Sequence, residues 1–496
     1  MTYDLVITNG ICVTASDIAA LDIAIKDEKI TLLAPSGSLA GTSAIRVIDA
    51  EGGYIMPGGI DCHVHLQEPA MFGGKGRSAD NYESGTRSAI AGGNTTIITF
   101  APLQKNETSP LAAVHATHAL ARGNCYCDYS FHLLMGNASA TALQELPRLK
   151  HEEGISSVKI YMTYKALQLR DNEILSILLT ARAHEILTMI HAENGDVLDW
   201  LTDQLELARK ISPKYHSNSR PPILEAEATN RAIALSSLVA NTPILLVHVS
   251  DPQAALRIRE AQTQGRPVFA ETCPQYLFLT RDDLDRPGFE GAKYICSPPP
   301  RRKQDQDAIW RGLRNATFSI LSSDHCPFSF DDAEKGKKSC VTPEHPEGHF
   351  RHVPNGLPGV ETRLPLVVSA DKMGLAEIVA VASTNPAKLY GLYPRKGALL
   401  PGISDADLTI WYPEGKFGKD LVLTNEMLHH DADYTPYEGR KLGNWPRYTV
   451  LRGKVVWDRD NGGVVGGKGY GQFVKRGSAV GVWDKVNEAG FDLEEL

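Results

Sequence analysis

The chain has 496 residues, more than a single hydrophobic core usually supports, so we expect a large domain joined to a smaller one. Its 42% hydrophobic and 22% charged residues are typical of a soluble globular protein. The net charge of −8 excludes the basic surface that a nucleic-acid-binding protein needs.

Neither the start of the chain nor its cysteines indicate export or a membrane. No apolar run is long enough to cross a bilayer, and MTYDLVITNG lacks the basic start and long apolar centre of a signal peptide. The eight cysteines are scattered, and only Cys125 and Cys127 lie close together. We therefore predict a cytoplasmic protein with reduced thiols and without a membrane partner.

The sequence pattern divides the chain into four segments. Residues 1–54 show short alternating strands separated by turns, residues 55–392 alternate strand-like with helix-like stretches, and residues 393–460 return to short strands. Neither end has enough strands to close a sheet alone, so we predict that the two ends pair in one small β-sandwich domain. Residues 461–496 begin with a Gly-rich stretch, and we expect this C-terminal tail to reach a neighbouring subunit or to stay mobile.

The central segment contains eight candidate strands that are rich in Val, Ile and Phe, as strands buried on both faces are. Helical patterns such as SPLAAVHATHALA and PQAALRIREAQTQ lie between them. Eight such units predict an α/β fold with a (β/α)8 TIM barrel, whose active site lies at the C-terminal ends of its strands. The candidate strands are residues 55–60, 95–100, 129–134, 157–161, 188–191, 244–249, 268–271 and 318–321.

Four of these strands are followed or ended by residue types that bind metal ions. GGIDCHVHLQEP carries His63 and His65, TMIHAEN carries His191, PILLVHVSD carries His248, and FSILSSDHCPF carries Asp324. The spacing of the first pair points both imidazoles to one face of an extended segment. Taken singly, the two later histidines fit satisfied core positions equally well, and the aspartate fits a helix N-cap. Because all of them fall at one end of the predicted barrel, we favour a metal-dependent hydrolase.

Lys159 ends a fifth apolar strand, in the segment SSVKIYM. A buried ammonium is costly unless it is paired. One interpretation is therefore an ion pair with a nearby carboxylate, or a side chain that reaches the rim. The other is that burial and an adjacent metal charge lower its pKa, so that the neutral amine adds carbon dioxide and the resulting carbamate bridges two metal ions. The local sequence leaves both open.

The chain resembles the amidohydrolase superfamily, and within it the dihydropyrimidinases and hydantoinases. Further matching segments are KIYMTYK, ETCPQYL, CSPPPR, PNGLPGVETR and NPAKLYGLYPRKG, so the resemblance covers nearly the whole chain in order. In that family an HxH pair, a carbamylated lysine on the fourth strand, histidines on the fifth and sixth strands and an aspartate on the eighth bind two metal ions, usually zinc. The resemblance also implies a homotetramer. The implied metal ligands are His63, His65, Lys159 with its CO2-derived carbamate, His191, His248 and Asp324.

The same resemblance implies a reaction and three substrate-binding residues. Tyr164 is expected to hydrogen-bond the developing oxyanion, and Ser297 and Asn355 to hold the amide groups of the ring, largely through their backbones. On residue type alone, each also fits a loop or turn position. A metal-bridging hydroxide would attack the ring carbonyl, while Asp324 moves a proton to the leaving nitrogen. The expected substrate is a small cyclic amide, either a dihydropyrimidine such as dihydrouracil or a 5-substituted hydantoin, and the product is an N-carbamoyl amino acid.

Two features bear on the substrate. In dihydroorotases an arginine stands where this chain has Gln67, and a neutral amide cannot form an ion pair with a substrate carboxylate, which disfavours dihydroorotate. The segment 329–353 carries His345, His349 and His352. A third metal site is one interpretation of these histidines, and a flexible rim or lid is the one that we favour.

Three alternatives to this function stay open at the level of sequence. Allantoinase and other cyclic-imide amidohydrolases are the nearest competitors. Non-catalytic relatives share the fold but have lost metal ligands, whereas this chain keeps every ligand position. A mononuclear deaminase also uses HxH, two histidines and an aspartate, but it needs neither Lys159 nor the SPPPR and PNG segments.

Overall fold

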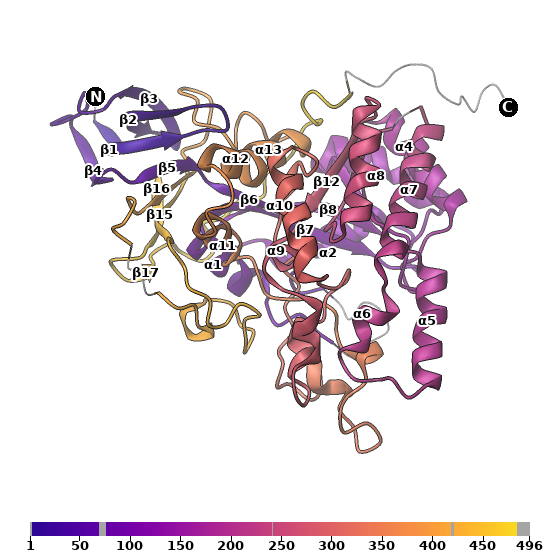
Figure 1. The fold of residues 1–496 in the computed structure, drawn as a ribbon. Helices are drawn as coiled ribbons and strands as arrows, with labels where there is room; N and C mark the ends of the chain where they lie inside the picture. Colours follow the sequence, from indigo (N-terminus) through magenta and orange to yellow (C-terminus); the bar gives the residue numbers. More distant parts are fainter. Residues whose placement is uncertain (1, 69–75, 241, 418–420, 484–496) are drawn as a thin grey trace.

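The computed structural model describes residues 2–68, 76–240, 242–417 and 421–483. Two sheets organise these residues: a ring of parallel strands, and a separate mixed sheet on one side of it (Figure 1). Among the described residues, no helix is both long and apolar enough to cross a membrane. All eight cysteines are free thiols.

Eight parallel strands form the barrel in chain order, which confirms the predicted (β/α)8 architecture. The ring closes where His325 follows the last strand. Its N–H donates to the carbonyl of His63 (3.2 Å), and its carbonyl accepts from the N–H of His65 (2.7 Å). The strands are β6 (Gly59–Val64), β7 (Asn94–Leu103), β8 (Asp128–Met135), β9 (Ser157–Tyr161), β10 (Leu187–His191), β11 (Ile244–Leu246), β12 (Val268–Thr272) and β13 (Ile320–Leu321).

Helices form the outer layer of the barrel, as Figure 1 shows for α4, α7 and α8. Local sequence sets where they begin. The hydroxyl of Ser109 accepts the N–H of Ala112 (3.2 Å) at the start of α2, and the carboxylate of Asp251 accepts the N–H of Gln253 (2.8 Å) at the start of α8. A proline occupies the first position of both helices, where no N–H is needed. The helices are α1 (Tyr82–Ala91), α2 (Pro110–Ala121), α3 (Ala140–Arg148), α4 (Asp171–Ala183), α5 (Gly195–Leu207), α6 (Tyr215–Ser219), α7 (Pro222–Leu238), α8 (Pro252–Thr263), α9 (Pro274–Phe278), α10 (Gln306–Arg314), α11 (Arg363–Ser369), α12 (Leu375–Val379) and α13 (Asn385–Leu389).

The mixed sheet combines strands from both ends of the chain, as predicted. Its central join is the antiparallel pairing of β14 with β5, and β1 pairs with β2, β4 and β5. Ile7, Ile23, Ile55, Leu408 and Val450 are buried in one core that these strands share. The residue limits of the domains stay a prediction. The strands are β1 (Tyr3–Val13), β2 (Ile18–Lys26), β3 (Lys29–Pro35), β4 (Ala44–Asp49), β5 (Tyr54–Pro57), β14 (Leu408–Trp411), β15 (Pro446–Leu451), β16 (Lys454–Asp458) and β17 (Gly463–Val464).

The first barrel strand differs from its prediction. The expected strand at residues 55–60 is divided, because β5 belongs to the mixed sheet and β6 to the barrel. The N–H of Gly58 donates to Asp407 of the mixed sheet, whereas the N–H of Gly59 donates to Gly93 beside the barrel (both 2.9 Å). A side-chain carbon on Gly58 would lie 2.1 Å from Oγ1 of Thr95, so the crossing between sheets requires glycine.

The C-terminal tail up to residue 483 packs on this chain's own barrel, which corrects the expectation of a mobile segment; contact with a neighbouring subunit stays a prediction. The N–H of Tyr129 donates to the carbonyl of Gln472 (2.9 Å), and the N–H of Val474 donates back to Tyr129 (2.8 Å). Arg476 is buried, and its guanidinium donates to the hydroxyl of Ser130 (2.9 Å). Phe473 and Val474 therefore anchor a segment whose glycines suggested mobility. Residues 484–496 lie outside the described residues.

Candidate metal centre

The six residues predicted as metal ligands lie in their strands or just after them and are at most 8% exposed. Two strands are shorter than predicted, because β11 ends at Leu246 and β13 begins at Ile320, and three of the six residues follow their strands. The structure places His63 in β6, His65 just after it, Lys159 in β9, His191 at the end of β10, His248 two residues after β11, and Asp324 three residues after β13.

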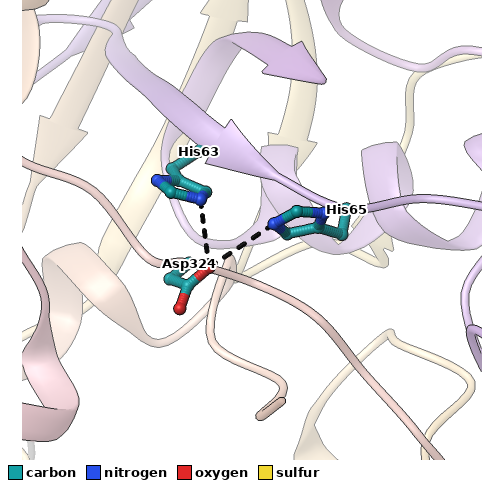
Figure 2. Close-up of side chains that lie close together, drawn as sticks. All are labelled: His63, His65 and Asp324. Carbon is teal, nitrogen blue, oxygen red and sulfur yellow. Dashed lines mark ion pairs between the residues drawn. The ribbon is translucent and has the colours of Figure 1, made fainter. Parts of the chain in front are cut away.

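His63, His65 and Asp324 form the tightest group (Figure 2). Oδ1 of Asp324 lies 3.2 Å from Nε2 of His63 and 3.6 Å from Nε2 of His65. Burial alone would raise the pKa of the Asp324 carboxyl, but the two imidazoles hold it below its usual range. Both ring nitrogens and the carboxylate oxygen therefore face one point, where they are able to bind a cation.

Two glutamates hold these imidazoles from behind. Nδ1 of His63 lies 2.7 Å from Oε1 of Glu271, and Nδ1 of His65 lies 2.8 Å from Oε1 of Glu68. Burial would lower the pKa of His65, but Glu68 and Asp324 outweigh it and raise the pKa to about 9. When a cation displaces the proton on Nε2, a carboxylate on Nδ1 keeps the other proton in place, which is the usual support of a metal-binding histidine.

His191 and His248 form a second group, with 4.4 Å between their ring centroids. Nε2 of His191 lies 2.7 Å from the carboxylate of Glu193, which also pairs with Arg220. Burial opposes this, but Arg220 and His191 lower the pKa of Glu193 to about 2. The backbone of His248 has a φ of 39°, a conformation that costs energy for a residue with a side chain and is often found at functional sites.

Lys159 lies between the two groups and is 1% exposed. Its Nζ lies 4.8 Å from the ring centroid of Tyr161 and 5.6 Å from that of Phe100. Burial lowers the pKa of its ammonium to about 8, although the charges of Asp324 and Glu271 oppose this shift.

The donor set fits divalent metal ions. Nδ1 of His248 is buried without a hydrogen-bond partner among the described residues, and Nε2 of His63 lies 3.2 Å from Oδ1 of Asp324 without the geometry of a hydrogen bond. Buried polar atoms are normally satisfied, so these two imidazole nitrogens at one barrel mouth indicate that something else completes them. Imidazole nitrogens with carboxylate oxygens suit zinc better than calcium or magnesium, which prefer oxygen alone.

The three predicted substrate-binding residues also lie together at this mouth. Nδ2 of Asn355 donates to the hydroxyl of Tyr164 (3.1 Å) and to that of Ser297 (3.0 Å). Arg220 stacks on the ring of Tyr164, with 5.2 Å from its guanidinium carbon to the ring centroid. Tyr164 has a φ of 63°, a further strained position in the site.

Two adjoining cavities give access to this centre. The inner one, of about 30 Å³, is lined by His63, His191, His248 and Asp324, together with the three substrate-binding residues. The outer one, of about 360 Å³, shares Tyr164, Asn355 and Cys326 with it and extends to Phe350. Gln67 instead lines a separate cavity beside Phe100. Glu68, Glu193, Glu271 and Cys326 received no role from the sequence, although each stands in one of the segments GGIDCHVHLQEP, TMIHAEN, ETCPQYL and FSILSSDHCPF.

A (β/α)8 barrel with histidines, a lysine and an aspartate at its mouth defines a class of metal-dependent hydrolases. A model of the amidohydrolase family matches residues 54–209 and 245–456. The chain belongs to this family and, within it, to the hydantoinases and dihydropyrimidinases. Membership implies a divalent metal in the site.

Similarity to individual relatives extends over nearly the full length. The chain is 41% identical to a D-hydantoinase from Streptomyces coelicolor over 96% of this chain and 98% of the relative. It is 42% identical to a D-hydantoinase from Geobacillus stearothermophilus, over 95% of this chain and 96% of the relative. The crystal structure of a dihydropyrimidinase from Brevibacillus agri superposes with a TM-score of 0.88 at 40% identity, covering 95% of this chain and 98% of the other.

Proposed function

We propose that this chain opens the ring C–N bond of a 5-substituted hydantoin or of a dihydropyrimidine such as dihydrouracil, giving an N-carbamoyl amino acid. As a member of the hydantoinase and dihydropyrimidinase group, it is a metal-dependent hydrolase of cyclic amides. The proposal that the reaction takes place at this site rests on one observation: His63 and His65 both face Asp324, and a glutamate supports each imidazole.

The six clustered residues would hold two zinc ions. His63, His65 and Asp324 supply one set of donors, and His191 and His248 supply another. Lys159, as a carbamate, would bridge the two sets, and its burial and lowered pKa support this because they raise the fraction of neutral amine that is able to take up carbon dioxide. Two divalent ions, when bound, would lower the pKa of a water molecule and polarise the ring carbonyl.

Residues of the chain itself would position the ring and move the proton. Asp324 would accept a proton from the attacking water and deliver it to the leaving nitrogen, which is the work of a general base and then a general acid. The hydroxyl of Tyr164 would donate to the developing oxyanion. Ser297 and Asn355 would hold the amide groups, and the hydrogen bonds from Asn355 support this because they lock the three side chains together.

The subunit arrangement is a separate proposal. We infer a homotetramer from the family resemblance, and exposed apolar side chains on β4 support an intersubunit contact: Ile45 is 78% and Val47 57% exposed. Light scattering coupled to gel filtration should give about four chains per particle. A cytoplasmic location stays a prediction from the sequence.

Initial rates on a substrate panel test the proposed reaction. The zinc-loaded protein is offered dihydrouracil, dihydrothymine, phenylhydantoin, allantoin and dihydroorotate, and the N-carbamoyl product is identified by chromatography. A hydantoin or dihydrouracil should lead the panel, and chelation of the metal should abolish the rate. If allantoin led, the chain would be an allantoinase. A lead by dihydroorotate would overturn the argument from Gln67, and no turnover with full metal content would indicate a non-catalytic relative.

A further inference from the structure

A separate cluster of side chains of types that bind metal ions lies on the rim of the outer cavity. Glu206, His349 and His352 each offer one ligand atom, and these atoms all lie within 4.8 Å of one another. Glu206 is in the last turn of α5, whereas the two histidines flank and end a short 3-10 helix at Phe350–His352. None of the three belongs to the catalytic centre described above. We call this group, together with His345, the rim cluster.

The geometry of the rim cluster brings its imidazoles around one carboxylate. Nε2 of His349 lies 3.1 Å from Oε1 of Glu206. The ring of His349 lies 4.8 Å from that of His352 and 5.3 Å from that of His345, measured between centroids. His349 is 7% exposed, and all four residues line a cavity of about 800 Å³ on the surface. A hydrated ion therefore has room to enter.

The charges around the rim cluster leave one carboxylate oxygen for a cation. Arg351 pairs with Oε2 of Glu206 and, at 2.6 Å, with Asp203. These two carboxylates exceed the charge of the guanidinium by one, and Oε1 of Glu206 contacts Nε2 of His349. Arg209 and Glu344 line the same cavity with opposite charges.

We propose that Glu206, His349 and His352 bind a third divalent transition-metal ion such as Zn²⁺, and that His345, which stands outside the 4.8 Å group, moves in as a fourth ligand. Three imidazoles and one carboxylate make a four-coordinate set of the kind that zinc prefers. His349 now accepts a hydrogen bond from the N–H of Arg351 at Nδ1 (3.3 Å). On metal binding, Nε2 would give its proton to solvent and Nδ1 would take one up, so the ring stays neutral. This long hydrogen bond and the contact of Nε2 with Oε1 of Glu206 (3.1 Å) would both be lost, and bonds to the metal would take the place of the second.

The proposed ion would tie the end of α5 to one wall of the outer cavity. Phe350, Arg351 and His352 line that cavity directly. The rim is already joined to α5 by the ion pairs of Arg351 with Glu206 and Asp203, and to the residues after α5 by a hydrogen bond from the N–H of Phe350 to the carbonyl of Ile211 (2.8 Å). An ion on the rim cluster would add a further connection to these.

Equilibrium dialysis with Zn²⁺ tests this site without depending on activity. The parent, His352→Gln and His115→Gln are first dialysed to constant metal content and then titrated. His115 is the matched control, because it is a surface histidine 3.2 Å from Glu153 at a different place on the barrel. The parent and the control should take up one further ion per chain, and His352→Gln should bind it about tenfold more weakly or worse.

Two outcomes would overturn the proposal: a parent that takes up no further ion, or uptake that is equal in all three proteins, which would indicate scattered surface binding. His352 is an exposed position, so its replacement should not unfold the chain, and circular dichroism checks this. The comparison is independent of the catalytic centre. If the catalytic centre does not hold metal as proposed, the metal content before titration changes equally in all three proteins. The difference between them in the further uptake of Zn²⁺ stays the same.

Discussion

His63 and Glu271 form a buried pair with 2.7 Å between Nδ1 and Oε1. The same Oε1 atom accepts the backbone N–H of His248 at 3.1 Å. One carboxylate therefore orients a histidine from each of the two groups of the metal centre. Because a neutral imidazole carries one N–H, donation from Nδ1 leaves Nε2 of His63 as a lone pair directed toward Asp324.

Removing this carboxylate should weaken the metal centre without touching a ligand. Glu271→Ala should lower metal affinity by roughly 10–100-fold, because the tautomer and orientation of His63 are no longer fixed. Glu271→Gln keeps a hydrogen-bond acceptor and should lose less metal affinity than Glu271→Ala. The measurement is the metal retained after dialysis against a graded chelator. An alanine variant that holds metal as tightly as the parent would remove Glu271 from the account.

Substitution of Lys159 tests the bridging carbamate. Lys159→Ala should lower activity by at least about 100-fold. Loss of a group that only orients a metal ligand already lowers metal affinity or activity by about 10–100-fold, and loss of a ligand itself should cost at least as much. The fold should persist, since Val158 and Ile160 around it belong to the apolar core. A small carboxylic acid with bicarbonate should partly restore metal and turnover to this variant. Lys159→Arg separates the two interpretations, because arginine keeps the charge but cannot form the carbamate. Near-parent activity in Lys159→Arg would show that the residue is a structural ammonium.

Tyr164→Phe should separate oxyanion stabilisation from ring binding. The variant keeps the aromatic face on which Arg220 stacks but loses the hydroxyl. We expect kcat to fall by roughly 10²–10³-fold with KM and metal content little changed, because the hydroxyl acts on charge that develops in the transition state. Steady-state kinetics on a hydantoin give both constants. A rise in KM with kcat unchanged would instead make Tyr164 a ground-state binding residue.

Lys337 joins the two segments that present the proposed ring-binding side chains. Its Nζ donates to the carbonyls of Ile295 and Pro354 (both 3.1 Å), which lie next to the segments of Ser297 and Asn355, and Lys337 is fully buried. Burial lowers the pKa of this ammonium to about 7, well below its ordinary value of 10.5.

The pH dependence of stability follows from this lowered pKa. Between pH 7 and 10 the unfolded chain binds a proton at Lys337 that the folded chain does not, so stability rises with pH by at most about 1.4 kcal/mol per unit. Lys337→Met removes this contribution. The thermal midpoint of the parent should therefore rise relative to that of the variant from pH 7 to 9. The half-buried neighbour Lys338→Met is the control for loss of a lysine from the same segment. A difference between the parent and Lys337→Met that stays constant with pH would contradict the lowered pKa.

Sequence alone predicts the barrel and the metal-binding positions, and it misses what supports them. Ligands at strand ends are predictable because parallel strands in a barrel bring His63, Lys159 and His191 to one mouth whatever the helices do. Glu271 could not be predicted because it reaches His63 only across the closed barrel, 208 residues further along the chain. Glu68 stands only three residues after His65, but the sequence pattern does not show that its carboxylate contacts the imidazole. Composition misled at the tail, where glycines suggested mobility although Phe473 packs beside Tyr129, 5.7 Å between ring centroids.

The most direct test of the account is a zinc titration of metal-depleted protein, followed through the initial rate of hydantoin ring opening. The rate should be negligible without metal and should reach its plateau at about two ions per chain, in the parent and in His352→Gln alike. A full rate without metal, or a plateau at one ion per chain, would contradict a centre built from both histidine groups and Lys159.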